Sequence, residues 1–288
     1  MIGAGPTTTR RRLRAELRSL RLAKKLSVED VVSEVEWSTS KLIRIENGQV
    51  SISVSDLTAL LRLYGPVDAV RENQLKQLAR ASKQRRWWSG YQRYLSAPYL
   101  AFIGYESDST SIRQYHPTMV PGLLQTEEYA RAVNEAIGSV EPADGVLEAQ
   151  LKAAMMRQRH VLHRPDPPRF VALIDEAALR RPVGGPAVMR DQLNHLVKLS
   201  AQENVTMVVV PFQAGPHRGL LGPFALMEYA DPLNDDVVAV GHHGGTMIVQ
   251  DQPDVIKDYR QAADDLVDLG LHGEDAIRFI QEVLRELS

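Results

Sequence analysis

The segment spanning residues 27–48 constrains the fold more strongly than any other part of the chain. It begins with Ser27, which can cap a helix, and the aspartate three residues later can reach back to the same helix start. Ser38 can cap a second helix, and Asn47 with Gly48 would end it, because these residues best tolerate a left-handed backbone. The pattern predicts two short helices, residues 28–35 and a second that reaches residue 46, joined by a tight turn at residues 36–37.

Three further helices are expected around this pair. Leucines spaced four and three residues apart predict a helix over residues 9–25 with one buried stripe. A fourth helix follows a cap at Ser53 or Ser55 and ends before Gly65, and a fifth covers roughly residues 67–82. We therefore expect an all-α, five-helix N-terminal domain over residues 7–84. The side chains expected to face inward on the fifth helix are Val70, Leu75 and Leu78.

From residue 85 onward, short β-rich stretches alternate with helical ones. This alternation is typical of a mixed α/β domain, which we expect over residues 85–288. The expected strands are residues 170–174, 205–210, 223–229, 237–240 and 247–249, the last after a turn at residues 244–245. The expected helices are residues 126–137, 146–163, 188–202, 254–269 and 274–287. The fold class is thus multidomain, an all-α domain followed by an α/β domain.

The net charge of −2 conceals a division of charge along the chain. Residues 1–86 hold 17 Lys/Arg and 9 Asp/Glu, a net charge of +8, while the remainder has a net charge of −10. A basic module joined to an acidic body indicates that one end meets phosphates. The chain has no cysteine and no apolar run near the ~20 residues of a membrane helix, and its first residues lack the apolar core of a secretory signal. We expect a cytoplasmic, nucleoid-associated protein without a membrane partner.

The second helix of the pair in residues 27–48 offers one face to a partner. If Leu42 and Ile45 are buried, the opposite face is free to enter the ~12 Å wide major groove of B-DNA. Arg44 can give a guanine two hydrogen bonds, and the hydroxyls near the helix start can contact base edges, while lysine, asparagine and helix-start amides can hold phosphates. The expected DNA-contacting residues are Ser27, Ser38, Thr39, Ser40, Lys41, Arg44 and Asn47.

Residues 13–64 resemble the Xre/Cro-type helix-turn-helix regulators, through Trp-Ser-x-Ser-Lys-Leu-x-Arg-Ile-Glu-Asn-Gly above all. The resemblance implies a lambda-repressor-like domain and an ion pair between Arg21 and Glu46. The chain departs from the family at Val28, where glutamine is frequent, and at Val32, where a small alanine is usual. The residues that the resemblance places against bases are Thr39, Ser40 and Arg44.

The resemblance continues beyond the helical domain. Arg86-Trp-Trp, residues 105–115 and the segment Val-Pro-Gly-Leu-Leu-Gln-Thr-Glu-Glu-Tyr-Ala-Arg-Ala at 120–132 are similar to actinobacterial WhiJ-like regulators, which join this module to a C-terminal domain of unknown function. This resemblance implies control of development or antibiotic production. It also implies a small protein partner, because members of this subgroup are described as antitoxin-like.

The C-terminal domain offers one candidate binding surface. Residues 211–224 form a long, glycine-rich connection between two expected strands, and Phe212, His217 and Arg218 on it could contact a ligand or a partner. A simple hairpin connection is an equal alternative. Histidine pairs at 160/163 and 242/243 lack a third ligand at a recognised spacing, and the acids at 175 and 176 are better placed to start a helix than to catalyse. No catalytic residue, metal or cofactor is expected.

These observations lead us to expect a sequence-specific DNA-binding transcriptional regulator, not an enzyme. It would bind double-stranded DNA as a homodimer on an inverted-repeat operator, because one module reads only a few base pairs. The C-terminal domain would bind a small-molecule effector or a protein and support dimerisation. The alternative is an antitoxin-like interaction protein that sequesters a small protein partner and regulates its own expression through DNA.

Overall fold

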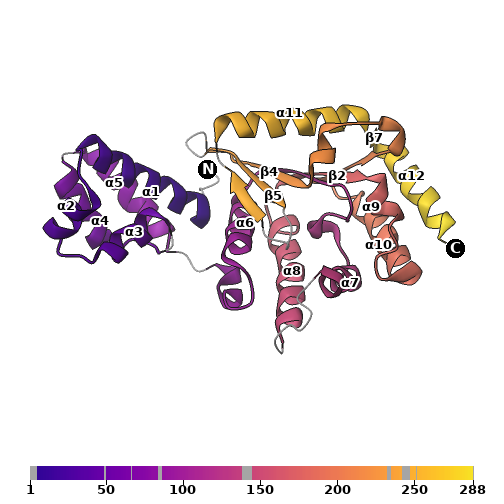
Figure 1. The fold of residues 1–288 in the computed structure, drawn as a ribbon, viewed down its shortest axis with the longest axis horizontal. Coiled ribbons are helices and arrows are strands. Elements are labelled where there is room, and N and C mark those ends of the chain that lie inside the picture. Colours follow the sequence, from indigo (N-terminus) through magenta and orange to yellow (C-terminus); the bar gives the residue numbers. More distant parts are fainter. Residues whose placement is uncertain are drawn as a thin grey trace. The chain divides into compact units, whose positions relative to one another are not determined.

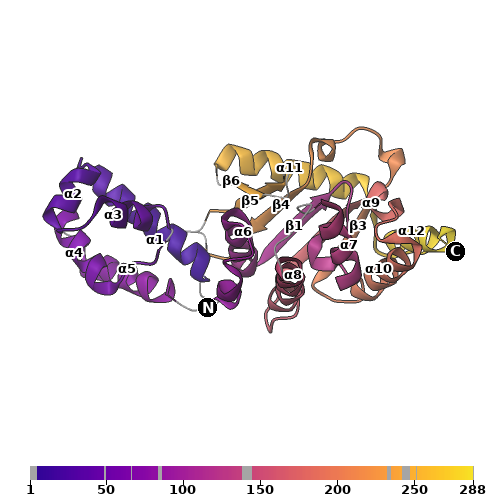
Figure 2. The ribbon, with the colours of Figure 1, turned by 60° about the horizontal axis from the view of Figure 1, so that its bottom comes forward.

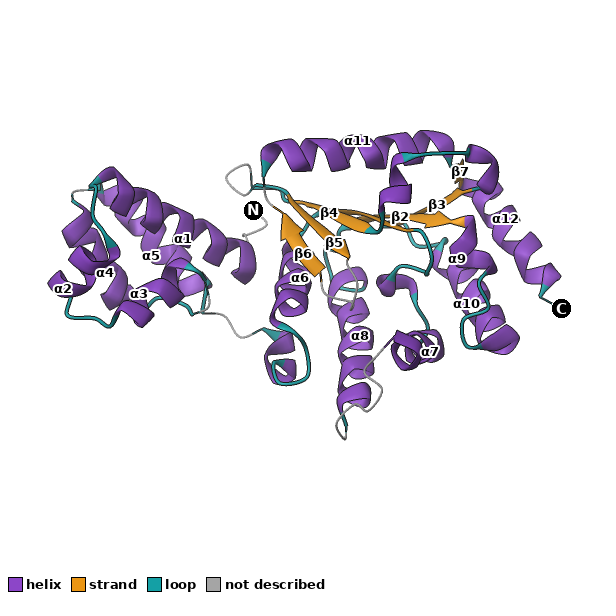
Figure 3. Ribbon diagram, in the orientation of Figure 1, coloured by secondary structure: helices purple, strands orange, loops and turns teal. Residues whose placement is uncertain are grey.

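The computed structural model describes residues 5–48, 50–65, 67–83, 86–137, 145–231, 235–241, 247–250 and 252–287. The chain divides into two compact units, residues 1–87 with 230–234 and residues 88–229 with 235–288. Figure 1 shows the course of the chain, and Figure 3 shows helices in the first unit and helices around a sheet in the second. The expected fold class, an all-α domain followed by a mixed α/β domain, is confirmed.

Five helices form the described part of the first unit. Their hydrophobic core is made by the inward faces of all five, with Leu17, Leu42 and Leu57 almost completely buried. The first helix begins at Pro6, three residues earlier than expected, since proline is favoured in a first helical turn. The helices are α1 (Pro6–Ala23), α2 (Val28–Glu34), α3 (Thr39–Glu46), α4 (Val54–Tyr64) and α5 (Ala69–Ala81).

The caps that the sequence indicated are present. Ser27 and Asp30 form a reciprocal capping box at the start of α2, and the hydroxyl of Ser38 accepts the N–H of Lys41 at the start of α3. The left-handed backbone after α3 falls on Gly48, with φ +69°. These contacts explain why two helices of seven and eight residues can begin where they do.

One expectation about the core is wrong. Val70 was expected to face inward, but its side chain is 69% exposed. Asp68 caps α5, so Val70 lies in the first turn, before the helix reaches the core. Leu75 and Ala79 make the buried contacts of this helix, and Leu78 packs beside them.

The second unit is built on a seven-stranded sheet in the order β6-β5-β4-β1-β2-β3-β7. Strands β1, β2 and β3 are parallel, and the outer strands pair antiparallel. The strands are β1 (Ser111–His116), β2 (Arg169–Asp175), β3 (Val205–Val210), β4 (Phe224–Glu228), β5 (Val237–Gly241), β6 (Met247–Gln250) and β7 (Leu271–His272). The α-helices are α6 (Ala97–Asp108), α7 (Glu127–Ile137), α8 (Val146–Leu162), α9 (Glu176–Arg180), α10 (Gly185–Leu199), α11 (Pro253–Leu269) and α12 (Gly273–Glu286). Short 3-10 turns are η1 (Trp87–Tyr91), η2 (Gly122–Leu124), η3 (Phe212–Ala214) and η4 (Arg218–Leu221).

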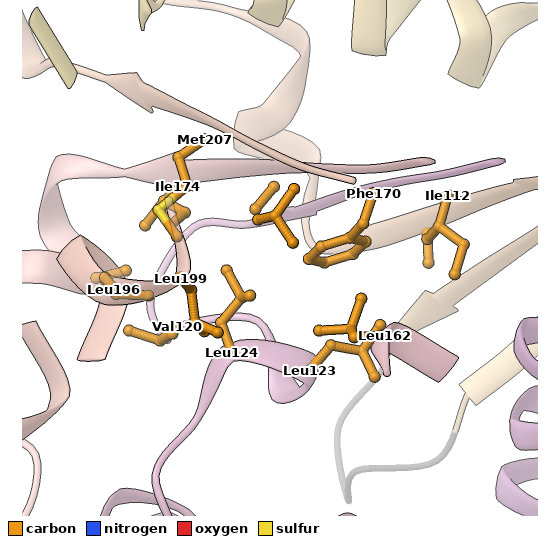
Figure 4. Close-up of a cluster of buried hydrophobic side chains, with 14 of the residues drawn as sticks. Ile112, Val120, Leu123, Leu124, Leu162, Phe170, Ile174, Leu196, Leu199 and Met207 are labelled. Atoms are coloured by element: carbon orange, nitrogen blue, oxygen red, sulfur yellow. The ribbon is translucent and has the colours of Figure 1, made fainter. Parts of the chain in front are cut away.

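Both faces of this sheet are covered. Along β2, Phe170, Ala172 and Ile174 face the core shared with α7, α8, α10 and α12, part of which is drawn in Figure 4. The alternate residues Val171 and Leu173 face α11, which lies across the other side of the sheet (Figure 1). Between its charged ends, Arg169 and Asp175, the strand is therefore apolar, as expected for a parallel strand buried on two sides.

The central strand β1 was not expected from the sequence. Its residues, Ser-Ile-Arg-Gln-Tyr-His, contain only two large apolar side chains, Ile112 and Tyr115, which are fully buried. The helix expected from residue 188 begins at Gly185, because Gly184 supplies a left-handed start with φ +70°. The expected turn at residues 244–245 and the histidines at 242 and 243 lie outside the described residues.

Candidate functional site

The outer face of α3 is mainly polar, with Ile43 as its one large apolar side chain among the described residues. Leu42 and Ile45 are buried in the core of the first unit, and this fixes which side of the helix faces solvent. The expected DNA contacts therefore lie together, apart from Lys41 and Ser27. The exposed residues on and beside α3 are Ser38, Thr39, Ser40, Ile43, Arg44 and Asn47.

Arg21 and Glu46 hold the end of α3 against α1. The Nε of Arg21 donates to Oε1 of Glu46 at 2.7 Å, and Nη2 donates to Oε2 at 2.9 Å. The remaining Nη1 donates to the carbonyl oxygen of Leu26 at 2.9 Å, in the loop before α2. Donation of these hydrogen bonds to Glu46 raises the pKa of Arg21. The two side chains are 9% and 10% exposed, so this is the nearly buried pair that the resemblance implied.

Lys41 is held within the domain. Its Nζ lies 2.9 Å from Oδ1 of Asp56 and 3.7 Å from the centre of the Trp37 ring. Partial burial raises the pKa of Asp56, but hydrogen bonds from Lys41 and Ser53 outweigh it and leave the pKa below its ordinary value. The ammonium group that was expected to meet a phosphate thus already neutralises a carboxylate.

Ser27 lies at a helix start that binds its own acid. The carboxylate of Asp30 accepts both the backbone N–H and the hydroxyl of Ser27, each at 2.8 Å. These bonds lower the pKa of Asp30, the backbone bond most of all. A phosphate approaching this helix start would meet a carboxylate in the place that favours anions.

The positive charge of the first unit lies mainly outside the helix pair. Residues 27–48 contain two basic side chains, Lys41 and Arg44, and five acidic ones, whereas α1 alone carries six arginines. One of these arginines reaches α3, since Nη1 of Arg14 donates to the carbonyl oxygen of Asn47 at 3.1 Å. Arg14 is therefore a candidate phosphate contact that the sequence did not indicate, because it lies 33 residues from Asn47.

The three candidate residues of the second unit do not form one site. Phe212 is exposed, and Arg218 lies 3.4 Å from Oδ2 of Asp265 on α11. His217 instead points inward, with a side chain that is only 4% exposed. Its ring meets the ring of Tyr115 edge-on, with centroids 6.0 Å apart.

His217 belongs to a buried polar cluster at the carboxyl ends of β1 and β2. The hydroxyl of Tyr115 donates to Oδ2 of Asp175 at 3.0 Å, and Nε2 of His217 lies 3.8 Å from the same oxygen. Burial raises the pKa of Tyr115, and the negative charge of Asp175 adds to this. The other oxygen of Asp175 accepts the N–H of Ala177 at 2.9 Å and so caps α9. The expectation that the acid at 175 starts a helix is confirmed.

This cluster was missed because its members come from three distant segments. Tyr115 lies on the unexpected strand β1, which pairs in parallel with β2 and so brings Tyr115 to the same end of the sheet as Asp175. The loop before β4 then brings the side chain of His217 next to Tyr115 and Asp175. Within the described residues, no group of three or more His, Asp or Glu side chains is placed to hold a metal ion.

Comparisons with known proteins support this division of the chain. Residues 12–74 match the model of a helix-turn-helix domain, which indicates DNA binding, and residues 99–282 match the domain of unknown function DUF5753. No curated protein and no solved structure matches the chain. No helix in the described ranges is both long and apolar enough to cross a membrane. Since the second match covers more than half of its length, the chain belongs to the DUF5753 family and joins that domain to an N-terminal helix-turn-helix domain.

Proposed function

We propose that this protein is a sequence-specific transcriptional regulator that reads DNA bases with the outer face of α3. The observation that carries the proposal is the exposure of Thr39, Ser40 and Arg44 on a helix whose other side is buried. A helix held in this way can enter the major groove without rearrangement, and Arg44 can form a bidentate pair with guanine. The pair of Arg21 with Glu46 keeps that face in place.

The regulator would act as a homodimer on an inverted repeat. One recognition helix contacts only a few base pairs, whereas two helices about 34 Å apart contact a site long enough to be distinctive. The phosphate contacts would come from Arg14, beside the end of α3, more than from the start of α2. We place the protein in the Xre/Cro type and, on the segments at 86–88, 105–115 and 120–132, in its WhiJ-like subgroup. Such a regulator would work in the cytoplasm, at the nucleoid.

The C-terminal domain would bind an effector or a protein and would not catalyse a reaction. Both oxygens of Asp175 already accept hydrogen bonds, one from Ala177 and one from Tyr115, so this carboxylate serves the fold. His217 is enclosed between Tyr115 and the backbone of Gly219. A closely packed cluster of this kind suits the positioning of a binding loop better than turnover of a substrate.

Selection of bound fragments from genomic DNA by the purified full chain tests the proposal. We expect enrichment of an inverted repeat whose half-sites lie about one helical turn, or a multiple of it, apart. The free energy of binding should become less favourable with salt, because phosphate contacts release counterions. If the chain enriches no sequence and does not retain duplex DNA at low salt, the proposed function is wrong.

A further inference from the structure

Large apolar side chains are exposed mainly in one region of the second unit. Leu221 is 93% exposed and Leu220 is 65% exposed, and both belong to η4 in the loop between β3 and β4. Phe212 lies on the same loop, and Leu269 ends α11. Among the described residues of this unit, the remaining exposed side chain of this kind is Ile137 on α7. Exposed apolar groups that gather in one place mark interaction surfaces.

The 3-10 turn η4 packs against α11. Nε of Arg218, at the start of η4, is 3.4 Å from Oδ2 of Asp265, and Leu269 follows Asp265 by one helical turn. Figure 2 shows the loop rising beside the C-terminal half of α11. We call the surface made by Phe212, Leu220, Leu221 and Leu269 the loop patch.

The loop that carries the two leucines is anchored to the domain at three points. The N–H of Phe212 donates to Oε2 of the buried Glu176 at 2.8 Å, which anchors the start of the loop. His217 is packed against Tyr115. Gly219 lies so close to the same ring that an added Cβ would be 2.6 Å from it. Leu220 and Leu221, the most exposed large apolar side chains among the described residues of this unit, therefore lie on a tightly packed support.

The charges around the loop patch have both signs. Arg218 is half exposed, and the acidic side chains of Asp265 and Asp268 lie on the neighbouring turns of α11. A surface with one sign of charge would repel its own copy, whereas this one is self-complementary. Arg218 lies beside Asp265 of its own chain and keeps half of its side chain exposed, so two copies related by a two-fold axis can place it against Asp268 of the other copy, with the leucines buried between them.

We propose that the loop patch is the surface through which two copies of this chain associate. The inference rests on the proposed function, which needs two recognition helices on one operator. Burial of the leucines supplies the attraction, since apolar area removed from water drives most protein association. The pairs between Arg218 and Asp268 of the other copy set the relative orientation of the copies.

Sedimentation of the full chain tests this directly. We compare the unchanged protein with the double variant Leu220→Ser/Leu221→Ser and with Ile137→Ser, an exposed apolar position outside the loop patch. The unchanged protein and Ile137→Ser should be dimers at micromolar concentration, and the double variant should be a monomer. Loss of two central apolar anchors raises a dimer dissociation constant by roughly 100-fold or more. Circular dichroism should be the same for all three, because both leucines are exposed in the fold.

Two outcomes would overturn the inference: a monomeric unchanged protein, which would leave the loop patch for a different partner, or a double variant that dimerises as before. Binding to a full inverted repeat and to a single half-site separates this result from the proposed function. The double variant should bind the half-site with the same affinity as the unchanged protein. It should lack the higher affinity that the unchanged protein has for the full repeat. If no form binds either duplex, the regulator proposal fails while the sedimentation result still decides the interface.

Discussion

Arg21 of α1 donates two parallel hydrogen bonds, of 2.7 and 2.9 Å, to the carboxylate of Glu46, the last residue of α3. This fork-to-fork geometry is the strongest that arginine makes with a carboxylate. Because the two residues are 25 positions apart, the pair links α3 to α1 and adds to the hold that the buried Leu42 and Ile45 have on the helix. The orientation of the proposed recognition surface therefore depends on a contact made behind it.

Glu46→Ala should destabilise the helical domain by about 3 kcal/mol, since it leaves a nearly buried guanidinium without its carboxylate. Hydrogen exchange of the full chain, read at amides of α1 and α3, measures this locally. The matched control is Glu34→Ala, an exposed acid of α2, which should change the free energy of opening by no more than about 0.5 kcal/mol.

The double variant Arg21→Met/Glu46→Leu should recover most of that stability, because apolar groups of similar size avoid the cost of an unpaired charge. Equal exchange rates in Glu46→Ala and the unchanged chain would show that the pair does not hold α3.

Asp56→Asn should strengthen binding to all duplexes by several-fold. The change removes the carboxylate that lies 2.9 Å from Nζ of Lys41 and frees its ammonium group for a phosphate. The slope of log affinity against log salt should steepen by about 0.9, the value for one added phosphate contact on B-DNA. Fluorescence titrations at several salt concentrations measure both quantities.

Asp68→Asn is the control, because it removes one negative charge at the start of α5 and asparagine still caps a helix. It should leave the salt slope unchanged. A slope that stays the same in Asp56→Asn as well would mean that Lys41 does not reach DNA.

The stability of the C-terminal unit should fall as the pH drops from about 6.5 to about 4. Burial lowers the pKa of His116 to about 4, whereas the unfolded chain has an ordinary value of about 6.5. Between these values the unfolded chain binds a proton that the folded chain does not. The free energy of unfolding therefore decreases with falling pH, by at most about 1.4 kcal/mol per pH unit from this group.

His116→Asn should flatten this dependence. An asparagine oxygen can accept the N–H of Met119, which Nδ1 of His116 accepts at 3.1 Å, but it does not titrate. Urea unfolding across this pH range measures the slope. An unaltered slope in His116→Asn would contradict the assignment.

Local signals were sufficient to predict the helical domain. The caps at Ser27 and Ser38 and the buried positions Leu42 and Ile45 each depend on residues within one helix turn of each other. The sequence therefore located the exposed face of α3 correctly. The error at Val70 arose because the apolar pattern does not tell where along a helix the core begins.

Contacts between distant segments could not be predicted in the same way. Strand β1 carries few apolar residues, and its central place depends on parallel pairing with β2. The contacts of Lys41 with Asp56 and of Tyr115 with Asp175 depend in turn on how whole elements pack. Such contacts alter the expected role of a residue: Lys41 is paired within its domain, and His217 is buried on a loop expected to be a surface.

The proposed function depends above all on Arg44 contacting a base. Its most direct measurement is a titration of Arg44→Ala against the preferred duplex and a scrambled duplex of equal length, beside Arg80→Ala, an exposed arginine on α5. Arg44→Ala should lose roughly 10- to 100-fold in preference for the selected sequence, the worth of one bidentate contact, and Arg80→Ala should keep that preference. An Arg44→Ala protein that still prefers its sequence fully would show that the outer face of α3 does not read DNA.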